Sequence, residues 1–237
     1  MKTVTLVSAL LATAAAVAAS AAMAIEYARS RLAHALCWAV SLGLFAVASS
    51  VLAAGALLGW SSGLFRVYYL VGGVLVVPWM ALGATWLFGS LRLARFGTCL
   101  TVGLTVVAVL VTVPAKVAAP GPGMPELREA LGGAAASRVL AAIANAGGTV
   151  VALSLLLRAS STFRRKGVLP NKARGAALIS VGITAAAAGG VLAAVGHVAC
   201  LAPSLAVGAI LLFVGFRLWN RAPRRPRTPR DSGVRRG

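Results

Sequence analysis

Acidic side chains are scarce in this sequence, because its 237 residues include four Asp and Glu residues against 23 Lys and Arg residues. The acids are Glu26, Glu126, Glu129 and Asp231, and none of them falls within the long apolar runs described below. Ionisable groups inside a bilayer are costly and therefore mark functional sites. Without a carboxylate in an apolar run, proton-coupled transport and metal-dependent hydrolysis lose support. We predict no catalytic residues, and this weighs against an enzyme.

Residues that bind metals or cofactors are also few. Cys37, Cys99 and Cys200 show no CxxC spacing and no neighbouring Cys or His set for a tetrahedral metal site. His34 is expected at the cytoplasmic start of the second span and His197 at the outer end of the sixth. The thickness of the membrane separates them, so a single haem cannot bind both. We therefore predict no metal site, no cofactor-binding residues and no cofactor.

Apolar residues, in contrast, are abundant. They make up 59% of the chain, charged residues make up 11%, and the mean hydropathy is +0.90. This composition leaves too little polar surface to surround a water-soluble core. A net charge of +19 would suggest nucleic-acid binding in a soluble protein. Here the basic residues lie between apolar runs, which is typical of topology determinants, so no nucleic-acid partner is expected.

The apolar runs have the length of membrane spans. A helix needs about 20 apolar residues to cross the hydrocarbon core of a bilayer. Seven windows qualify, at approximately 4–25, 34–58, 67–89, 97–115, 139–157, 175–196 and 204–219. The sequence therefore predicts an all-α fold, a polytopic bundle of seven transmembrane helices over residues 1–219 that lies in the lipid bilayer.

The basic residues predict the orientation of this bundle, because Lys and Arg in short loops are retained in the cytoplasm. With the N-terminus outside, the inside segments hold 18 basic residues: Arg29, Arg31, Arg92, Arg95, Arg158, Arg164, Arg165, Lys166, Lys172, Arg174 and the eight arginines from Arg217 to Arg236. The outside segments hold five: Lys2, Arg66, Lys116, Arg128 and Arg138. Residues 220–237, rich in Pro and Arg, are predicted to be a disordered cytoplasmic tail that contacts anionic lipid headgroups.

The first window allows a second interpretation. It begins with Met1 and Lys2, continues through an apolar stretch and ends in Ala22, Met23 and Ala24, which resembles a signal-peptide cleavage site. Cleavage would leave six helices and would move the basic clusters to the outside. The apolar run is also longer than a usual signal core. We therefore predict an uncleaved first helix.

The polar and small residues within the predicted spans indicate packing. The row Gly182, Ala186 and Gly190 predicts a small-residue face, and Asn145 predicts a bridging hydrogen bond between helices. Pro78 beside Trp79 predicts a bend in the third span.

The residues at the ends of the spans indicate the membrane boundaries. Two groups of aromatic side chains are expected to form belts, Trp38, Trp86 and Trp219 at one boundary and Trp60, Tyr68 and Tyr69 at the other. Arg66 and Arg138 are expected to be snorkelling anchors at the outer boundary. The outer loop from Lys116 to Ser137 is expected to hold a short interfacial helix with Pro125 in its first turn.

Two segments between His34 and Gly89 carry a resemblance to a known group. They read HALCWAVSLGLFAVASS and GWSSGLFRVYYLVGGVLVVPWMALGATWLFG. They resemble an uncharacterised actinobacterial group of seven-helix integral membrane proteins with no assigned activity. The resemblance extends more loosely over the rest of the chain, including Asn171, Gly215 and Phe216. It implies the helix count and a plasma-membrane location, and it carries over no catalytic residues.

Three functions remain open on these observations. The first is a non-enzymatic sensor, scaffold or partner subunit with a membrane-protein partner, because the spans contain packing residues rather than reactive groups. The second is a small-solute or lipid transporter, which would need a polar cavity at mid-depth lined by Asn145, Trp79 and the glycine pairs. The third is an intramembrane lipid-modifying enzyme, which would need carboxylates or histidines clustered at one interface.

Overall fold

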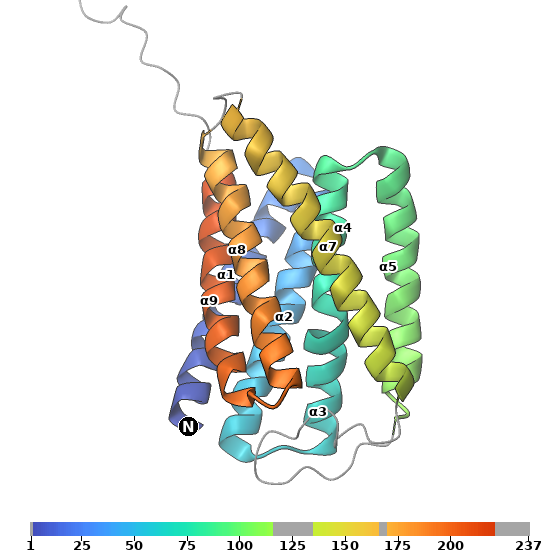
Figure 1. Cartoon of the computed structure of the whole chain (residues 1–237), viewed down its shortest axis with the longest axis vertical. Helices are drawn as coiled ribbons and strands as arrows, with labels where there is room; N and C mark the ends of the chain where they lie inside the picture. Colours follow the sequence, from blue (N-terminus) through green and yellow to red (C-terminus); the bar gives the residue numbers. More distant parts are fainter. Residues whose placement is uncertain (1, 116–134, 166–169, 221–237) are drawn as a thin grey trace, which may run out of the picture.

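The computed structural model describes residues 2–115, 135–165 and 170–220, and every regular element in these ranges is a helix (Figure 1). The elements are α1 (Lys2–Ser30), α2 (Ala33–Leu58), α3 (Ser62–Tyr68), the π-helix η1 (Tyr69–Leu75), α4 (Val76–Phe88), α5 (Leu91–Thr112), α7 (Ala135–Arg165), α8 (Pro170–Ala194), the 3₁₀ turn η2 (Val198–Cys200) and α9 (Leu201–Trp219). The predicted outer-loop helix and, beyond Asn220, the predicted disordered tail lie outside the described residues.

Seven helical stretches in these ranges are long and apolar enough to cross a membrane. They are Thr3–Ser30, Ala33–Leu58, Ser62–Phe88, Leu91–Thr112, Ala136–Arg165, Asn171–Ala193 and Val198–Trp219. The third stretch joins α3, η1 and α4, and the seventh joins η2 and α9. Successive stretches run up and down, so that the last one ends at the opposite end of the bundle from the N-terminus (Figure 1). The predicted all-α fold with seven spans is confirmed.

The helices extend beyond the predicted windows at several ends. The third span begins at residue 62 because the Ser61 hydroxyl accepts the Leu64 N–H at 3.2 Å. The fourth begins at residue 91 because Ser90 accepts the Leu93 N–H at 3.3 Å. These side chains cap the first turn of each helix. The predicted windows end at the first charged residue, because the hydropathy falls there. The helices themselves continue for as long as their backbone hydrogen bonds do.

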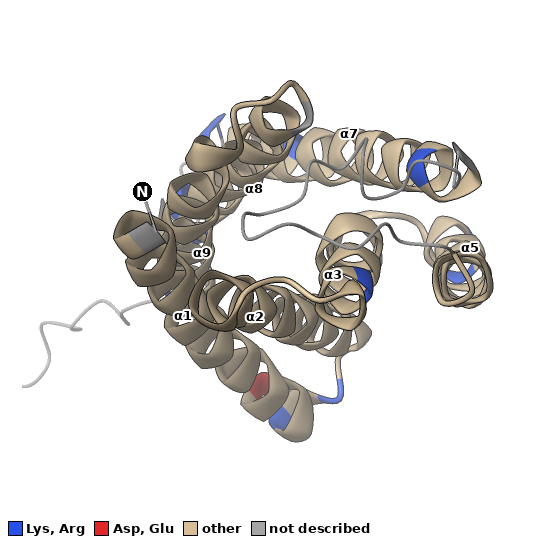
Figure 2. Ribbon diagram, turned by 90° about the horizontal axis from the view of Figure 1, so that it is seen from below, with Lys and Arg blue, Asp and Glu red and all other residues tan. Residues whose placement is uncertain are grey.

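The helices form a ring with one outlier (Figure 2). α1 packs against α2 and α9, α9 against α8, α8 against α7, and α7 against α4, which returns to α2. α5 stands outside this ring and contacts α4 and α7 along one edge. The buried centre is filled by side chains from six elements, among them Met23, Leu42, Met80, Leu156, Ile179 and Leu212.

Small residues bring the helices of the ring close together. On α1, the residues that are at most 1% exposed are Ala9, Ala12, Ala16, Ala19 and Met23, spaced three and four apart on one face. On α8, an added Cβ at Gly182 would lie 2.9 Å from the Gly208 carbonyl of α9, and one at Gly175 would lie 2.8 Å from the Gly215 carbonyl. The bilayer gives helices no hydrophobic drive to associate, so such close backbone packing stabilises the bundle.

The small-residue face of α8 differs from the predicted row at one position. A Cβ at Gly190 would meet nothing within 4 Å, whereas Gly189 packs directly against Ser204. Gly175, Gly182 and Gly189 are seven residues apart, which is the repeat of helices that cross at a small angle. A row at four-residue spacing rotates away from the partner helix, and Gly190 consequently faces outward.

Five of the six aromatic side chains predicted to form belts are buried inside the bundle instead of facing the membrane boundary. Trp38 is 1% exposed and Tyr69 is 2% exposed, so both rings point into the bundle. Trp60, Tyr68 and Trp219 are also buried. Trp60 packs edge-on against Tyr68 with ring centroids 5.6 Å apart. Aromatic side chains near the helix ends pack inside the bundle, where their large side chains contribute the most contact area.

Candidate functional site at the interrupted third span

The third span contains a π-helical segment, η1, between two α-helical segments. In this segment the Val76 N–H donates to the Val71 carbonyl, five residues back. In the same register the Gly73 carbonyl would pair with the N–H of residue 78, which is Pro78 and has none. Proline therefore removes the donor that would pair the Gly73 carbonyl in the π-helical register. π-Helical segments of this kind frequently occur at functional sites.

Asn145 of α7 provides the missing donor. Its side-chain nitrogen Nδ2 donates to the Gly73 carbonyl at 2.6 Å across 72 residues of sequence. The predicted bridging hydrogen bond from Asn145 is confirmed, and its acceptor is the carbonyl whose π-register donor is missing at Pro78. A carbonyl without a partner at this depth would be costly, because no water is present to pair with it.

The opposite side of the third span is hydrogen-bonded by α2. The Ser41 hydroxyl donates to the Val76 carbonyl at 2.8 Å, and the Trp38 indole nitrogen Nε1 donates to the Met80 carbonyl at 3.2 Å. A Cβ at Gly83 would overlap the Trp38 ring, so glycine is what lets the indole lie against the α4 backbone. The ring also contacts Phe216 of α9, with centroids 4.8 Å apart. The interrupted span is therefore held from both sides.

The glycines around the interruption lie against neighbouring helices. An added Cβ at Gly72 would be 2.7 Å from the Ala48 side chain, and one at Gly148 would be 2.9 Å from the Val77 side chain. Trp79 is partly buried and packs against the same apolar cluster. The residues that a transporter would use to line a mid-depth cavity thus make helix-to-helix contacts.

The two histidines and three cysteines lie apart, as predicted. His34 is at the start of α2 beside the Trp38 ring, and His197 precedes η2 at the other end of the bundle. Cys37 is buried in α2, whereas Cys99 and Cys200 are exposed on different helices. Within the described part of the chain, no group of three or more His, Cys, Asp or Glu residues could hold a metal ion.

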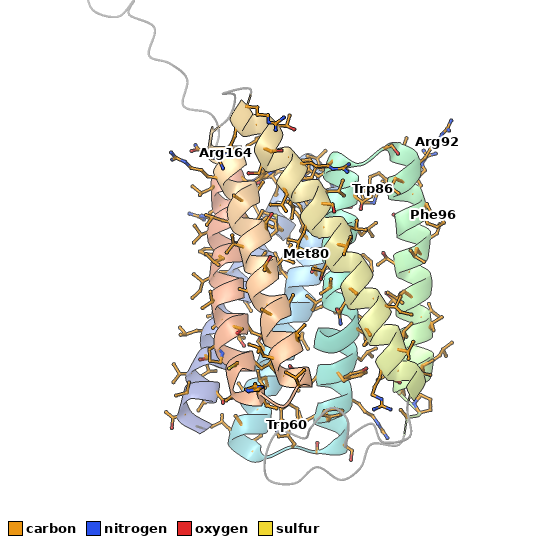
Figure 3. All side chains as sticks on the ribbon, in the orientation of Figure 1. Trp60, Met80, Trp86, Arg92, Phe96 and Arg164 are labelled. Carbon is orange, nitrogen blue, oxygen red and sulfur yellow. The ribbon has the colours of Figure 1, made fainter. Side chains whose placement is uncertain are left out.

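Basic residues are concentrated at one end of the bundle. Figure 3 labels two of them, Arg92 and Arg164, at the end opposite to Trp60. The other described basic residues of this end are Arg29, Arg31, Arg95, Arg158, Arg165, Lys172, Arg174 and Arg217. At the far end the described basic residues are Lys2, Arg66 and Arg138. Arg66 does not extend outward as an anchor, because its Nη2 donates to the Ala115 carbonyl at 2.9 Å.

α5 exposes most of its apolar surface. Its buried residues are Ala94, Thr101, Ala108 and Thr112, a single line along the helix. Hydrogen bonds tie α5 to the third span near both ends, from Arg66 to the Ala115 carbonyl and from the Trp86 indole to the Thr98 hydroxyl at 3.1 Å. Large apolar side chains cover the other faces, and Phe96 and Leu100 are 66% and 62% exposed.

A groove of about 380 Å³ runs beside this exposed surface. It is lined by Phe96, Cys99, Leu100, Gly103, Leu104 and Val107 of α5 and by Leu140 of α7. A Cβ at Gly103 would meet nothing within 4 Å, so the groove is open at its small residues. Cys99 and Gly103 are four residues apart on one helix face, the spacing through which two helices can approach closely.

Comparison with known proteins gives no relatives. No family, no curated protein and no solved structure matches this chain. Function has to be inferred from the contacts of the chain's own residues.

Proposed function

We propose that this chain is a non-enzymatic scaffold or partner subunit of the plasma membrane that assembles with a second copy of itself through α5. The observation that supports the proposal is the exposed apolar face of α5 with its adjoining groove. Cys99 and Gly103 form the small-residue part of that face, and Phe96 and Leu100 flank it. A face of this kind is self-complementary, because two parallel α5 helices related by a two-fold axis along the membrane normal present the same residues to each other.

The polar groups of the spans support a non-enzymatic role. The side chains of Asn145, Ser41, Trp38 and Tyr69 all donate hydrogen bonds to backbone carbonyls of other helices. Each of these side chains therefore uses a donor hydrogen for packing helices together rather than for a substrate. The described residues thus favour assembly of a bundle over transport or lipid modification.

Cys99 is a built-in reporter for this assembly. In membranes treated with a mild oxidant, a chain that keeps Cys99 and carries Cys37→Ala and Cys200→Ala is expected to form a disulfide-linked dimer. The dimer forms because the two Cys99 side chains approach each other at the axis, and a disulfide needs Cβ atoms about 3.5 to 4.5 Å apart. Adding Gly103→Leu fills the contact and is expected to abolish the dimer.

The matched control is a chain that keeps only Cys200, which is exposed but lies away from α5. Equal dimer formation through Cys99 and Cys200 would indicate random collision and would refute assembly through α5. A monomer in all variants would also refute assembly through α5. A cross-linked product of a mass other than twice the monomer would assign the groove to a different membrane protein.

We further propose that the basic end faces the cytoplasm and that the N-terminus lies outside. Lys and Arg concentrated at one end support this orientation. A cysteine introduced at residue 123 or 232 of a Cys-free chain tests it in intact cells with a membrane-impermeant reagent. Labelling at 123 alone is the expected result, and labelling at 232 would reverse the orientation. The arginine-rich tail then adjoins the anionic leaflet, where each Lys or Arg gains about 1 kcal/mol.

The resemblance to the uncharacterised actinobacterial group agrees with this proposal in helix count. Membership of that group is part of the proposal and rests on the segments between His34 and Gly89. Conservation of Cys99 or Gly103 as small residues in such proteins would support assembly through the same face.

A further inference from the structure

One line of exposed side chains on α5 extends beyond the groove to the basic end of the bundle. Its members follow one another at alternating steps of four and three residues, which keeps them on a single helix face. We call this line the α5 seam, and its exposed members are Arg92, Phe96, Cys99, Gly103, Val106 and Leu110. The same repeat occurs where two helices pack side by side at a small angle. Arg92, at the basic end (Figure 3), is the one charged member.

The proposed assembly through α5 places two positive charges against each other. In a pair with its two-fold axis along the membrane normal, each seam position meets the same position of the second copy, so Arg92 faces Arg92. Arg95, three residues further on, adds a charge beside the seam. The one acid among the described residues is Glu26 of α1, and α1 packs against α2 and α9, away from α5 (Figure 2). The described residues therefore supply no counter-ion for this pair of like charges.

The position of Arg92 along α5 places its charge at the level of lipid headgroups. α5 (Leu91–Thr112) has 22 residues and begins one residue before Arg92. At 1.5 Å per residue this helix is about 33 Å long, which matches a hydrocarbon core about 30 Å thick. A long basic side chain in the first turn extends its charged group toward the interface. The seam thus runs along the hydrocarbon core and ends in an arginine among headgroup phosphates.

We propose that an anionic phospholipid of the leaflet at the basic end binds between the two Arg92 side chains and completes the α5 interface. This inference rests on the proposed assembly and names the lipid class that regulates it. A guanidinium offers donors only, whereas a headgroup phosphate carries several acceptor oxygens and pairs with both guanidinium forks at once. A zwitterionic lipid brings its own cation to the same place and leaves the repulsion in part. Assembly of this chain therefore depends on the anionic lipid content of the membrane.

Cross-linking through Cys99 in vesicles of defined composition tests the lipid site. The chain that keeps only Cys99 is reconstituted in phosphatidylcholine with increasing phosphatidylglycerol, at a constant ratio of chain to lipid and constant ionic strength. The disulfide-linked dimer is expected to increase saturably by about threefold or more, because the bridging anion offsets the repulsion between the two guanidinium groups. Inorganic phosphate added to pure phosphatidylcholine vesicles is expected to produce no such increase. An increase there would assign the site to a soluble ion and would overturn the lipid.

Substitutions of Arg92 separate this site from the general charge of the basic end. Arg92→Gln removes both the repulsion and the lipid site, so its dimer is expected to be equally abundant at every phosphatidylglycerol content. Arg92→Lys keeps the charge without the planar fork and is expected to need more phosphatidylglycerol for half of the increase. The matched control is Arg29→Gln, because Arg29 is exposed at the same end on α1 and its loss should leave the full response.

The possible results distinguish the lipid site from the assembly itself. A Cys99 dimer that forms equally at all phosphatidylglycerol contents would overturn the lipid site and leave the assembly intact. The same conclusion would follow from an undiminished response in Arg92→Gln or from loss of the response in Arg29→Gln. Absence of the dimer from every vesicle, with Arg92→Gln included, would overturn both proposals.

Discussion

Replacing Asn145 with leucine tests whether the interruption in the third span depends on a donor from α7. The variant keeps the size of the side chain and removes the hydrogen bond to the Gly73 carbonyl. Interhelical hydrogen bonds in membrane proteins contribute about 0.6 kcal/mol on average and up to about 1.7 kcal/mol. Because Pro78 lacks the N–H that would pair this carbonyl in the π-helical register, loss of the hydrogen bond also carries the cost of an unpaired buried group, about 1 to 3 kcal/mol. We expect a loss in unfolding free energy near the top of the membrane range, about 1.5 kcal/mol.

A double-mutant cycle with Pro78→Ala separates the hydrogen bond from general packing. Alanine at residue 78 restores a backbone N–H, which pairs the Gly73 carbonyl if the segment stays π-helical; if the segment becomes α-helical, the Val77 N–H pairs this carbonyl instead. Asn145→Leu is then expected to cost about 0.5 kcal/mol or less, giving a coupling of about 1 kcal/mol. Equilibrium unfolding in mixed micelles with SDS, followed by tryptophan fluorescence, measures all four corners of the cycle.

The control is Thr105→Val, because the Thr105 hydroxyl donates only to the Thr101 carbonyl of its own helix at 2.8 Å. That acceptor has its helical partner in any case, and the expected change is within about 0.5 kcal/mol. An equal cost of Asn145→Leu with and without Pro78 would refute the reasoning, because the Gly73 carbonyl would then not depend on Asn145.

Two further predictions concern helix packing. Ala16→Leu in the buried face of α1 is expected to lower the unfolding free energy by about 1 to 3 kcal/mol through overpacking, whereas Val17→Leu, at a position 53% exposed, is expected to be neutral. The same SDS unfolding experiment measures both variants, and equal effects would mean that α1 is not packed in the ring. Gly182→Ala is expected to destabilise the bundle because its Cβ would lie 2.9 Å from the Gly208 carbonyl, whereas the Cβ of Gly190→Ala would meet nothing and this variant is expected to leave the midpoint of SDS unfolding unchanged or raised. The reverse order of the two effects would support the predicted row at four-residue spacing on α8.

The number of spans could be predicted from the sequence because the bilayer imposes it. Every backbone group in the hydrocarbon core has to be paired, and a helix long enough to cross is a property of one continuous stretch of chain. The ends of the helices were harder to predict from the sequence, because Ser61 and Ser90 cap their helices several residues before the hydropathy rises. A serine ahead of the first apolar residues is the sequence signal that would have placed both starts.

The contacts of the third span were only partly predictable. Asn145 was identified as a bridging group, but its acceptor lies 72 residues away, and a single sequence contains no information on such a pair. The signal that was overlooked is local: Gly73 precedes Pro78 by five residues, the separation at which a π-helical hydrogen bond would form. Trp38 was expected at the membrane boundary because of its position in the helix, but which face it occupies depends on Gly83 of another span.

Most of the described side-chain hydrogen bonds between helices involve the third span, and two others join α1 to α2 and α7 to α8. α2, α5 and α7 are each joined to the third span by side-chain hydrogen bonds, those of Ser41, Trp86 and Asn145 among them. The seam between α8 and α9 instead consists of glycine and alanine contacts. Small-residue seams bring helices close but discriminate weakly between positions along the axis, whereas a hydrogen bond to one carbonyl fixes the register. The third span is therefore the element against which α2 and α7 are aligned, and Asn145 pairs the carbonyl whose π-register donor is missing at Pro78.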